Sequence, residues 1–371
     1  MVCVSLLHRH VQRPHPLGKV FGEDALQRFR GHRRPFGCVA RTLAPRRRPR
    51  RGGLRHRIFH PFPSWTKRVS LGAPRGSWQA KRITMRVPYT RLNRAELDRQ
   101  LSPSQSAKDF TGVLARHAAE TASLDADGAL RRWRDVAYGP GARQRYDVTA
   151  PKGAAGLPCL AFIHGGFWQE GSKAWSGFAA RPFAQAGWAH VGLGYTLAPE
   201  ATLSEIVDEI AAALIHLRAH AVEYGIDPDR IVLVGHSAGA HLAAAILTGL
   251  GGEPLAGAMA GYVLVSGVYD LAPVAASYVN DKMGLSPGEA ERLSPLLYWP
   301  AADRPVHLLI GAEEPDAFRQ QSEALALLWG RELRRISLTR CPGRDHFDIL
   351  DELARPGSES WIRIQRMGQG G

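Results

Sequence analysis

Ser237 stands in a setting that could make a serine nucleophilic. It is the centre of Gly235-His236-Ser237-Ala238-Gly239, which follows the apolar run Ile231-Val232-Leu233-Val234 and precedes small residues over 238–250. A serine hydroxyl becomes a useful nucleophile only when a base, an orienting acid and donors for an oxyanion surround it. The flanking glycines permit the tight strand-to-helix turn that lifts such a serine clear of a sheet. The pattern therefore predicts Ser237 as a catalytic nucleophile.

A second glycine pair could supply the oxyanion donors. The motif His164-Gly165-Gly166-Phe167-Trp168 follows another apolar run, over residues 159–163. Glycines let the backbone approach a substrate closely, and their N–H groups can face developing negative charge. We expect the N–H groups of Gly165, Gly166 and Ala238 to form the oxyanion hole, with Ala238 at a helix N-terminus.

Large side chains beside these motifs indicate a substrate pocket. Phe167 and Trp168 are predicted at the mouth of the pocket, where an aromatic leaving group could stack, and the hydrophobic core is the alternative for both. Tyr269 is assigned to the same pocket. His164 is expected to shape its loop rather than to transfer protons.

The general base is expected late in the chain, after the last strand. His346 follows an apolar run over residues 335–338 and is the only histidine after His307. Because His307 lies inside the apolar run 306–310, it is a poor candidate. His346 also completes the chain order serine, acid, histidine that this kind of nucleophile turn requires.

Three carboxylates compete for the role of the orienting acid. Glu313, Glu314 and Asp316 all follow the apolar run that ends at Gly311. Glu314 is preferred because it lies three residues past that glycine, and Glu313 and Asp316 remain as alternatives. The acid would hold the tautomer of His346 and stabilise the imidazolium that forms.

Apolar runs alternate with helical patterns through residues 85–371. This alternation predicts an α/β fold with a mostly parallel central sheet and helices on both faces. Residues 89–130 are expected to be mostly helical, and 271–304 to form a small cap beside the site or an ordinary surface excursion. The predicted strands are an antiparallel pair over 133–138 and 142–148, then 159–163, 189–195, 231–234, 262–266, 306–310 and 335–338.

Residues 85–360 carry several short motifs of one enzyme family. They are Leu101-Ser102-Pro103-Ser104, His164-Gly165-Gly166-Phe167-Trp168, Tyr195-Thr196-Leu197-Ala198-Pro199, Gly235-His236-Ser237-Ala238-Gly239-Ala240-His241-Leu242, Ser266-Gly267-Val268-Tyr269-Asp270-Leu271, Phe318-Arg319-Gln320-Gln321-Ser322 and Asp345-His346-Phe347. On these residues the chain resembles the kynurenine formamidase (arylformamidase) family of α/β-hydrolases, which is related to the hormone-sensitive-lipase-like esterases. The family's acid matches Glu314, where an aspartate is often seen.

The resemblance implies an α/β-hydrolase fold and a small-molecule substrate. That substrate would be N-formyl-L-kynurenine, cleaved to kynurenine and formate during tryptophan breakdown, with no metal and no organic cofactor. A broad short-chain carboxylesterase that uses the same residues on esters is the alternative. A binding protein built on a hydrolase fold is disfavoured, because serine, acid and histidine are all present.

Most of the basic charge lies in residues 1–84. This segment holds 20 Lys and Arg against two acids, whereas residues 85–371 hold 28 Lys and Arg against 32 Asp and Glu. An Arg- and Pro-rich segment without periodicity is expected to be disordered. We interpret it as the product of a start codon assigned too far upstream. A targeting peptide or a tail that binds nucleic acid nonspecifically or a membrane surface is the alternative.

The remaining composition points to a reducing compartment. Cys3, Cys38, Cys159 and Cys341 show no paired or metal-ligand spacing, and Cys159 is expected to be a small buried residue. No apolar run is long enough to span a membrane, and no signal peptide is evident. We therefore expect a cytoplasmic enzyme, with a homodimer as the candidate assembly.

Overall fold

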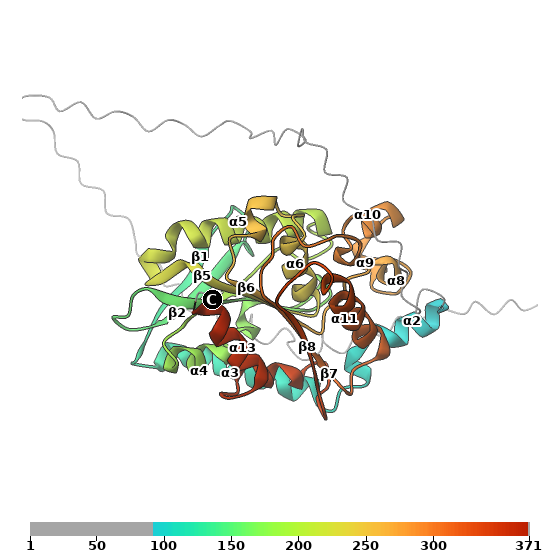
Figure 1. Ribbon diagram of the computed structural model, residues 1–371. Helices are drawn as coiled ribbons and strands as arrows, with labels where there is room; N and C mark the ends of the chain where they lie inside the picture. The colour runs from blue at the N-terminus through green and yellow to red at the C-terminus, as the bar shows by residue number, and fades with distance from the viewer. Residues whose placement is uncertain (1–91, 370–371) are drawn as a thin grey trace, which may run out of the picture. The chain divides into compact units, whose positions relative to one another are not determined.

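The computed structural model describes residues 92–369, so the tail predicted over 1–84 lies outside the described residues. Its centre is an eight-stranded sheet in the order β1-β2-β4-β3-β5-β6-β7-β8 (Figure 1). The β1–β2 and β2–β4 pairs are antiparallel and the other pairs are parallel. The strands are β1 Leu130–Ala137, β2 Arg145–Pro151, β3 Leu157–Ile163, β4 Ala189–Leu193, β5 Ile226–His236, β6 Gly261–Val265, β7 Val306–Gly311 and β8 Ile336–Cys341.

The central strands carry uninterrupted apolar runs, such as residues 231–234 of β5, because helices cover both faces of the sheet. In β5, Ile231 and Leu233 belong to a hydrophobic cluster with helices α5 (Leu203–His220), α6 (Ala238–Leu247) and α11 (Asp316–Trp329). Val232 and Val234 belong to a second cluster with α4 (Ala180–Gln185) and α13 (Glu359–Gly368). Successive side chains of a strand point to opposite faces. Both faces of β5 are therefore buried, as the uninterrupted apolar run predicts.

Helices α5 and α6 lie on one side of the sheet, and α3, α4 and α13 lie on the other (Figure 1). The α/β prediction is confirmed, although the sequence pattern did not anticipate α13. The α-helices are α2 Arg94–Gln100, α3 Phe110–Ser123, α4 Ala180–Gln185, α5 Leu203–His220, α6 Ala238–Leu247, α7 Glu253–Ala256, α8 Ala272–Ala275, α9 Asn280–Met283, α10 Pro287–Arg292, α11 Asp316–Trp329, α12 Asp351–Ala354 and α13 Glu359–Gly368.

Residues 271–304 form the small cap region, with the short helices α8, α9 and α10. Each of these helices contributes a buried side chain to the main hydrophobic cluster, namely Val274, Met283 and Ala290. The side chain of Asn280 holds the segment together through hydrogen bonds with the backbones of Ala275 and Leu285. The region is therefore packed against the hydrophobic core through these three side chains.

Two further features of the fold concern a cysteine and the length of the helices. Cys159 is fully buried and free, as expected for a small apolar residue of β3. Among residues 92–369, no helix is both long and apolar enough to cross a membrane.

Candidate active site

Ser237 occupies a sharp turn between β5 and α6. Its backbone has φ 55° and ψ −118°, a strained conformation for a residue other than glycine. Glycine is required on both sides of the turn: a Cβ on Gly235 would lie 2.1 Å from Gly239 O, and one on Gly239 would lie 2.1 Å from Ile163 O. The strand-to-helix turn expected from the glycine spacing is present.

A chain of hydrogen bonds leads from Ser237 into the protein. Ser237 Oγ lies 3.0 Å from His346 Nε2, and His346 Nδ1 lies 2.8 Å from Glu314 Oε2. A carboxylate can only accept, so Nδ1 carries the hydrogen and Nε2 is left to accept the serine proton. All three residues are buried. The geometry suits a serine that is activated by a histidine.

Of the three competing carboxylates, only Glu314 contacts His346. Its side chain is completely buried, whereas Glu313 and Asp316 are exposed. Asp316 instead forms an ion pair with Arg319 at the start of α11. Glu314 reaches the histidine because the turn after β7 directs its side chain inward, where Gly311 N–H donates to Glu314 Oε1 at 2.7 Å.

The glycine loop that follows β3, residues 164–171, is called the oxyanion loop below. It lies directly against the serine, because a Cβ on Gly165 would approach Ser237 Cβ to 3.0 Å. Gly166 has φ 109° and lets the chain turn back, so that the N–H groups of residues 169 and 170 both donate to Gly166 O. Ala238 begins α6, where a backbone N–H has no acceptor within the helix. The three predicted oxyanion donors therefore belong to segments that meet at Ser237.

His164 is placed to shape this loop. Its ring stacks on Tyr195 at 4.3 Å, and Nδ1 lies 2.8 Å from Gly165 O, an acceptor that requires Nδ1 to carry the hydrogen. Burial lowers the pKa of His164 to about 4. The ring is therefore neutral at physiological pH, and its contacts are those of a scaffold residue.

The predicted pocket residues are not placed alike. Phe167 is half-buried and lies near Phe318, whose ring is 4.4 Å from that of His346. Trp168 is completely buried and packs edge-on against His241, 5.0 Å between ring centres. The prediction of Trp168 at the mouth of a pocket is therefore wrong, because its indole fills the core. Tyr269 is likewise completely buried in the main hydrophobic cluster and offers no open surface.

His236, the residue before the nucleophile, supports His346. Its Nε2 lies 2.8 Å from His346 O, and the two rings are 4.8 Å apart. Burial, and then the neighbouring His346, lower the pKa of His236 well below its ordinary value. A neutral His236 donates to that carbonyl. The Gly-x-Ser-x-Gly pattern located this residue but gave no sign of its role.

The segment that begins at the last residue of β8, residues 341–348, carries His346 and is called the histidine loop below. Asp345 organises it by accepting hydrogen bonds from three backbone N–H groups, those of Phe347 and Asp348 within the loop and that of Lys108 from the N-terminal part of the body. Burial raises the pKa of Asp345, but these N–H groups outweigh it and leave the pKa below its ordinary value. Sequence reasoning did not assign a role to Asp345, and adjacency to His346 is its only local signal.

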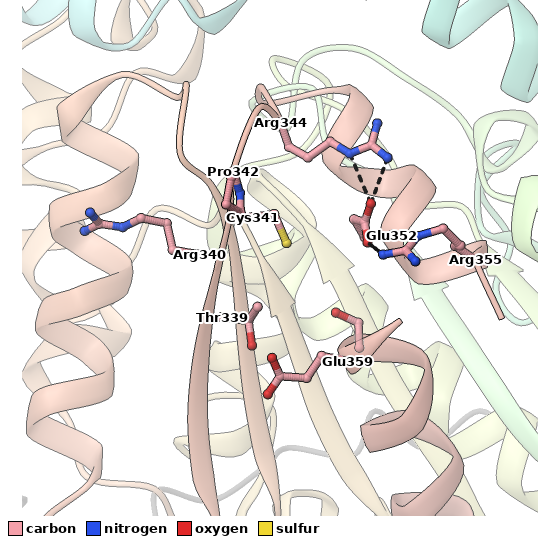
Figure 2. Close-up of a pocket in the computed structure, with 9 residues that line it drawn as sticks. Thr339, Arg340, Cys341, Pro342, Arg344, Glu352, Arg355 and Glu359 are labelled. Carbon is pink, nitrogen blue, oxygen red and sulfur yellow. Dashed lines mark hydrogen bonds and ion pairs between the residues drawn. The ribbon is translucent and has the colours of Figure 1, made fainter. Parts of the chain in front are cut away.

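A cavity of about 240 Å³ borders the histidine loop on the side of α12 and α13. Figure 2 shows Arg344 and Arg355 reaching Glu352 from two sides. Ser237, His346 and Glu314 are not among the residues that line the cavity. Its lining is Thr339, Arg340, Cys341, Pro342, Arg344, Glu352, Arg355, Glu359 and Ser360.

Within residues 92–369, no group of three or more His, Cys, Asp or Glu side chains is arranged to hold a metal ion. Both cysteines in this part of the chain, Cys159 and Cys341, are free thiols.

Comparison with known proteins places the chain in a family. The family model BD-FAE matches residues 146–263. The kynurenine formamidase of Salmo salar is 32% identical over 274 residues, which cover 71% of this chain and 92% of the relative. That of Danio rerio is 30% identical over 273 residues and is covered to the same extent.

A solved structure agrees with this result. A Silicibacter protein assigned as a thioesterase shares 29% identity and a TM-score of 0.65, with 73% of this chain and 99% of that one covered. The fold is therefore that of the α/β-hydrolases. The chain belongs to the kynurenine formamidase family and is a hydrolase that acts on an amide or an ester.

Proposed function

We propose that the protein hydrolyses the formamide bond of N-formyl-L-kynurenine and so acts in tryptophan breakdown. The observation that carries this proposal is the hydrogen-bond chain from Ser237 through His346 to Glu314 beside a glycine-rich loop. The two kynurenine formamidases reported above support the substrate, because this chain covers 92% of each.

The first half of the reaction forms a formyl-enzyme. Ser237 Oγ attacks the formyl carbon while His346 Nε2 takes its proton, and Glu314 stabilises the imidazolium. The oxyanion is bound by the N–H groups of Gly165, Gly166 and Ala238. The tetrahedral intermediate then breaks its C–N bond, and His346 gives the proton to the departing aryl amine.

The second half releases formate. Water attacks the formyl carbon, His346 takes the proton of the water, and a second tetrahedral intermediate forms in the same oxyanion hole. Breaking the C–O bond to Ser237 returns that proton to the serine oxygen. Each proton that leaves His346 is matched by one that returns, so the enzyme regains its starting state without a cofactor.

The second candidate is a short-chain esterase with the same three residues. The thioesterase-like Silicibacter structure favours it, since its whole length is covered at 29% identity. Activated esters and thioesters place the same demand on the nucleophile and the oxyanion hole as a formamide does. The two candidates differ in the leaving group and in the size of the acyl pocket.

A substrate comparison tests the proposal. We expect kcat/KM for N-formyl-L-kynurenine to exceed that for p-nitrophenyl acetate, and that for p-nitrophenyl butyrate to be lower still. Turnover of butyrate with negligible formamide hydrolysis would leave the esterase as the function. Comparing acetate with butyrate measures the acyl pocket separately from the leaving group.

Single substitutions test the roles of the residues. Ser237→Ala should lower kcat on the order of 10⁴-fold or more, and Glu314→Gln by roughly 10³-fold or more. Glu313→Gln and Asp316→Asn are the matched controls, because both carboxylates are exposed and neither contacts His346. A loss in either control as large as in Glu314→Gln would contradict the assignment of the acid.

A further inference from the structure

We propose that Ser266 is a positioning residue that fixes which oxygen of Glu314 faces His346. Ser266 follows β6 and is completely buried, and its Oγ donates to Glu314 Oε1 at 2.6 Å. The proposal rests on the role of Glu314 in the proposed function, and it extends the chain of hydrogen bonds by one residue.

The two oxygens of Glu314 have different partners. Oε1 accepts from Ser266 Oγ at 2.6 Å and from Gly311 N–H at 2.7 Å, while Oε2 accepts from His346 Nδ1 at 2.8 Å. A buried carboxylate is costly unless it is hydrogen-bonded, and these three donors satisfy it. Two fixed donors on Oε1 also set the plane of the carboxylate, so that Oε2 alone points at the imidazole.

A glutamate needs such support more than an aspartate does. Its side chain has one more rotatable bond, and a carboxylate held only by His346 could turn about its last bond. The hydroxyl of Ser266 and the N–H of Gly311 come from the ends of two neighbouring strands, β6 and β7. The acid is therefore held by the sheet itself.

The backbone of Ser266 adopts a conformation that favours glycine. Its φ is 52°, a conformation that glycine adopts freely and that costs a residue with a Cβ about 1–2 kcal/mol. The positive φ falls on the serine and not on the glycine that follows it, Gly267. Ser266 N–H donates to Leu309 O at 2.9 Å, which ties the strained residue to β7. The hydroxyl explains why a serine occupies a position where glycine would be less strained.

The rate at which a fluorophosphonate labels Ser237 tests this proposal without a substrate. In Ser266→Ala the labelling rate and kcat for p-nitrophenyl acetate should both fall about tenfold, with KM within twofold, because Oε1 keeps only one donor. Ser266→Gly also lacks the hydroxyl but relieves the backbone strain. It should lose the same activity while being at least as stable as Ser266→Ala.

The pH dependence separates positioning from a structural role. With one donor lost, the carboxylate holds the proton of the imidazolium more strongly, so the acid limb of the kcat/KM profile should move to higher pH by about half a unit. The other titratable groups near this pair are His236, Asp345 and Tyr269, which the substitution leaves in place. Ser358→Ala is the matched control, because this buried hydroxyl donates to Glu352 O at the same distance, 2.6 Å. It should lower stability and leave kcat and the pH profile unchanged.

A double-mutant cycle completes the test. The shorter carboxylate of Glu314→Asp cannot reach both the hydroxyl and His346, so adding Ser266→Ala to it should cost less than twofold. Full activity in Ser266→Gly, or an unshifted pH profile in Ser266→Ala, would overturn the proposal. If wild-type Ser237 is not labelled at all, the activation scheme and the role of Ser266 both fail. Labelling without formamide turnover rejects only the proposed substrate.

Discussion

The two loops that meet at Ser237 are held in place by different forces. The oxyanion loop depends on backbone conformation: Gly166, Phe167 and Trp168 have consecutive positive φ values of 109°, 47° and 59°. The histidine loop depends on side chains: Asp345 accepts hydrogen bonds from three backbone N–H groups, and Arg344 donates a hydrogen bond to Glu352. One half of the site is therefore shaped by steric fit and the other by charge and hydrogen bonding.

This difference has a chemical reason. Oxyanion donors are backbone N–H groups, and only the path of the chain can aim them. A general base is a side chain on a loop, which can shift unless buried acceptors fix the residues on both sides of it. The oxyanion loop should consequently respond most to added volume, and the histidine loop to changes in charge and salt.

Among variants that compare the two loops, the largest effect is expected from Gly165→Ala. The added Cβ would lie 3.0 Å from His236 Nδ1, His236 O and Ser237 Cβ, so the loop must move by a few tenths of an ångström. Displacing oxyanion donors costs roughly 10²–10³-fold in kcat, and KM should change little. Steady-state kinetics of this variant measure the loss.

Gly128→Ala is the matched control, because nothing lies within 4 Å of its added Cβ and neither glycine has a positive φ. Its kcat should equal that of the wild type. If Gly165→Ala kept kcat within threefold, the close fit of the loop against Ser237 would not be what shapes the oxyanion hole.

The second prediction concerns how the stability of each loop depends on pH. Burial, with Arg143 nearby, lowers the pKa of His164 to about 4, below its value of 6.5 in the unfolded chain. Its contribution to stability is present above pH 6.5 and is lost as pH falls towards 4, at about 1.4 kcal/mol per unit. The pKa of Asp345 is lowered below 3.8, so its contribution is lost only below that pH.

Hydrogen exchange of peptides from the two loops measures this difference. After correction for intrinsic exchange rates, protection of residues 164–171 should fall between pH 6.5 and 4 by about 3 kcal/mol. Residues 341–348 contact the buried His236, whose pKa is also lowered, so their protection should fall over that range as well. His164→Gln should reduce the loss in residues 164–171 and leave the loss in residues 341–348 unchanged, and an equal change in both loops would refute the separation.

The third prediction concerns the anchor of the histidine loop. Asp345→Asn keeps the size of the side chain but turns one acceptor into a donor that faces backbone N–H groups. We expect about a tenfold loss in kcat and a destabilisation of about 1–3 kcal/mol, measured by kinetics and urea unfolding. Asp229→Asn is the control, because its side chain is 82% exposed, and it should leave both quantities unchanged. A variant that loses stability but no activity would show that Asp345 supports the fold without positioning His346.

Much of the site could be predicted because its signals are local. The apolar runs before Ser237 and Gly165 mark strands that are buried on both faces, and the glycine spacing marks the tight turns that follow them. The order of serine, acid and histidine along the chain then predicts His346 as the base. These features depend only on residues that are close together in the sequence, so the sequence pattern is enough to predict them.

The remaining features depend on contacts that no local pattern contains. Asp345 accepts a hydrogen bond from the backbone N–H of Lys108, which lies 237 residues earlier in the chain. Ser266 meets Glu314 only because β6 and β7 are neighbours in the sheet. The motif that contains Trp168 is compatible with a position in a pocket or in the core. Only the packing of the indole against His241 shows that it lies in the core. The direction in which a side chain points from a turn depends on tertiary contacts. Only the structure therefore shows which of Glu313, Glu314 and Asp316 contacts His346.

The smallest effect is expected at the ion pairs that brace the histidine loop. Glu352→Gln removes the charge that holds Arg344 and Arg355, whose side chains are 30% and 57% exposed. Partly exposed ion pairs contribute about 1 kcal/mol or less, and salt screens them. The variant should therefore lose up to about 1 kcal/mol of unfolding free energy at about 0.05 M NaCl, and the difference should shrink at about 1 M.

Salt also provides the sharpest contrast between the loops. The defect of Gly165→Ala comes from a steric contact and should be the same at both salt concentrations, whereas that of Glu352→Gln should not. Measuring kcat and urea unfolding for both variants at both concentrations tests this directly. A salt-independent defect in Glu352→Gln would mean that the carboxylate acts on the histidine loop through its hydrogen bonds and packing rather than through its charge.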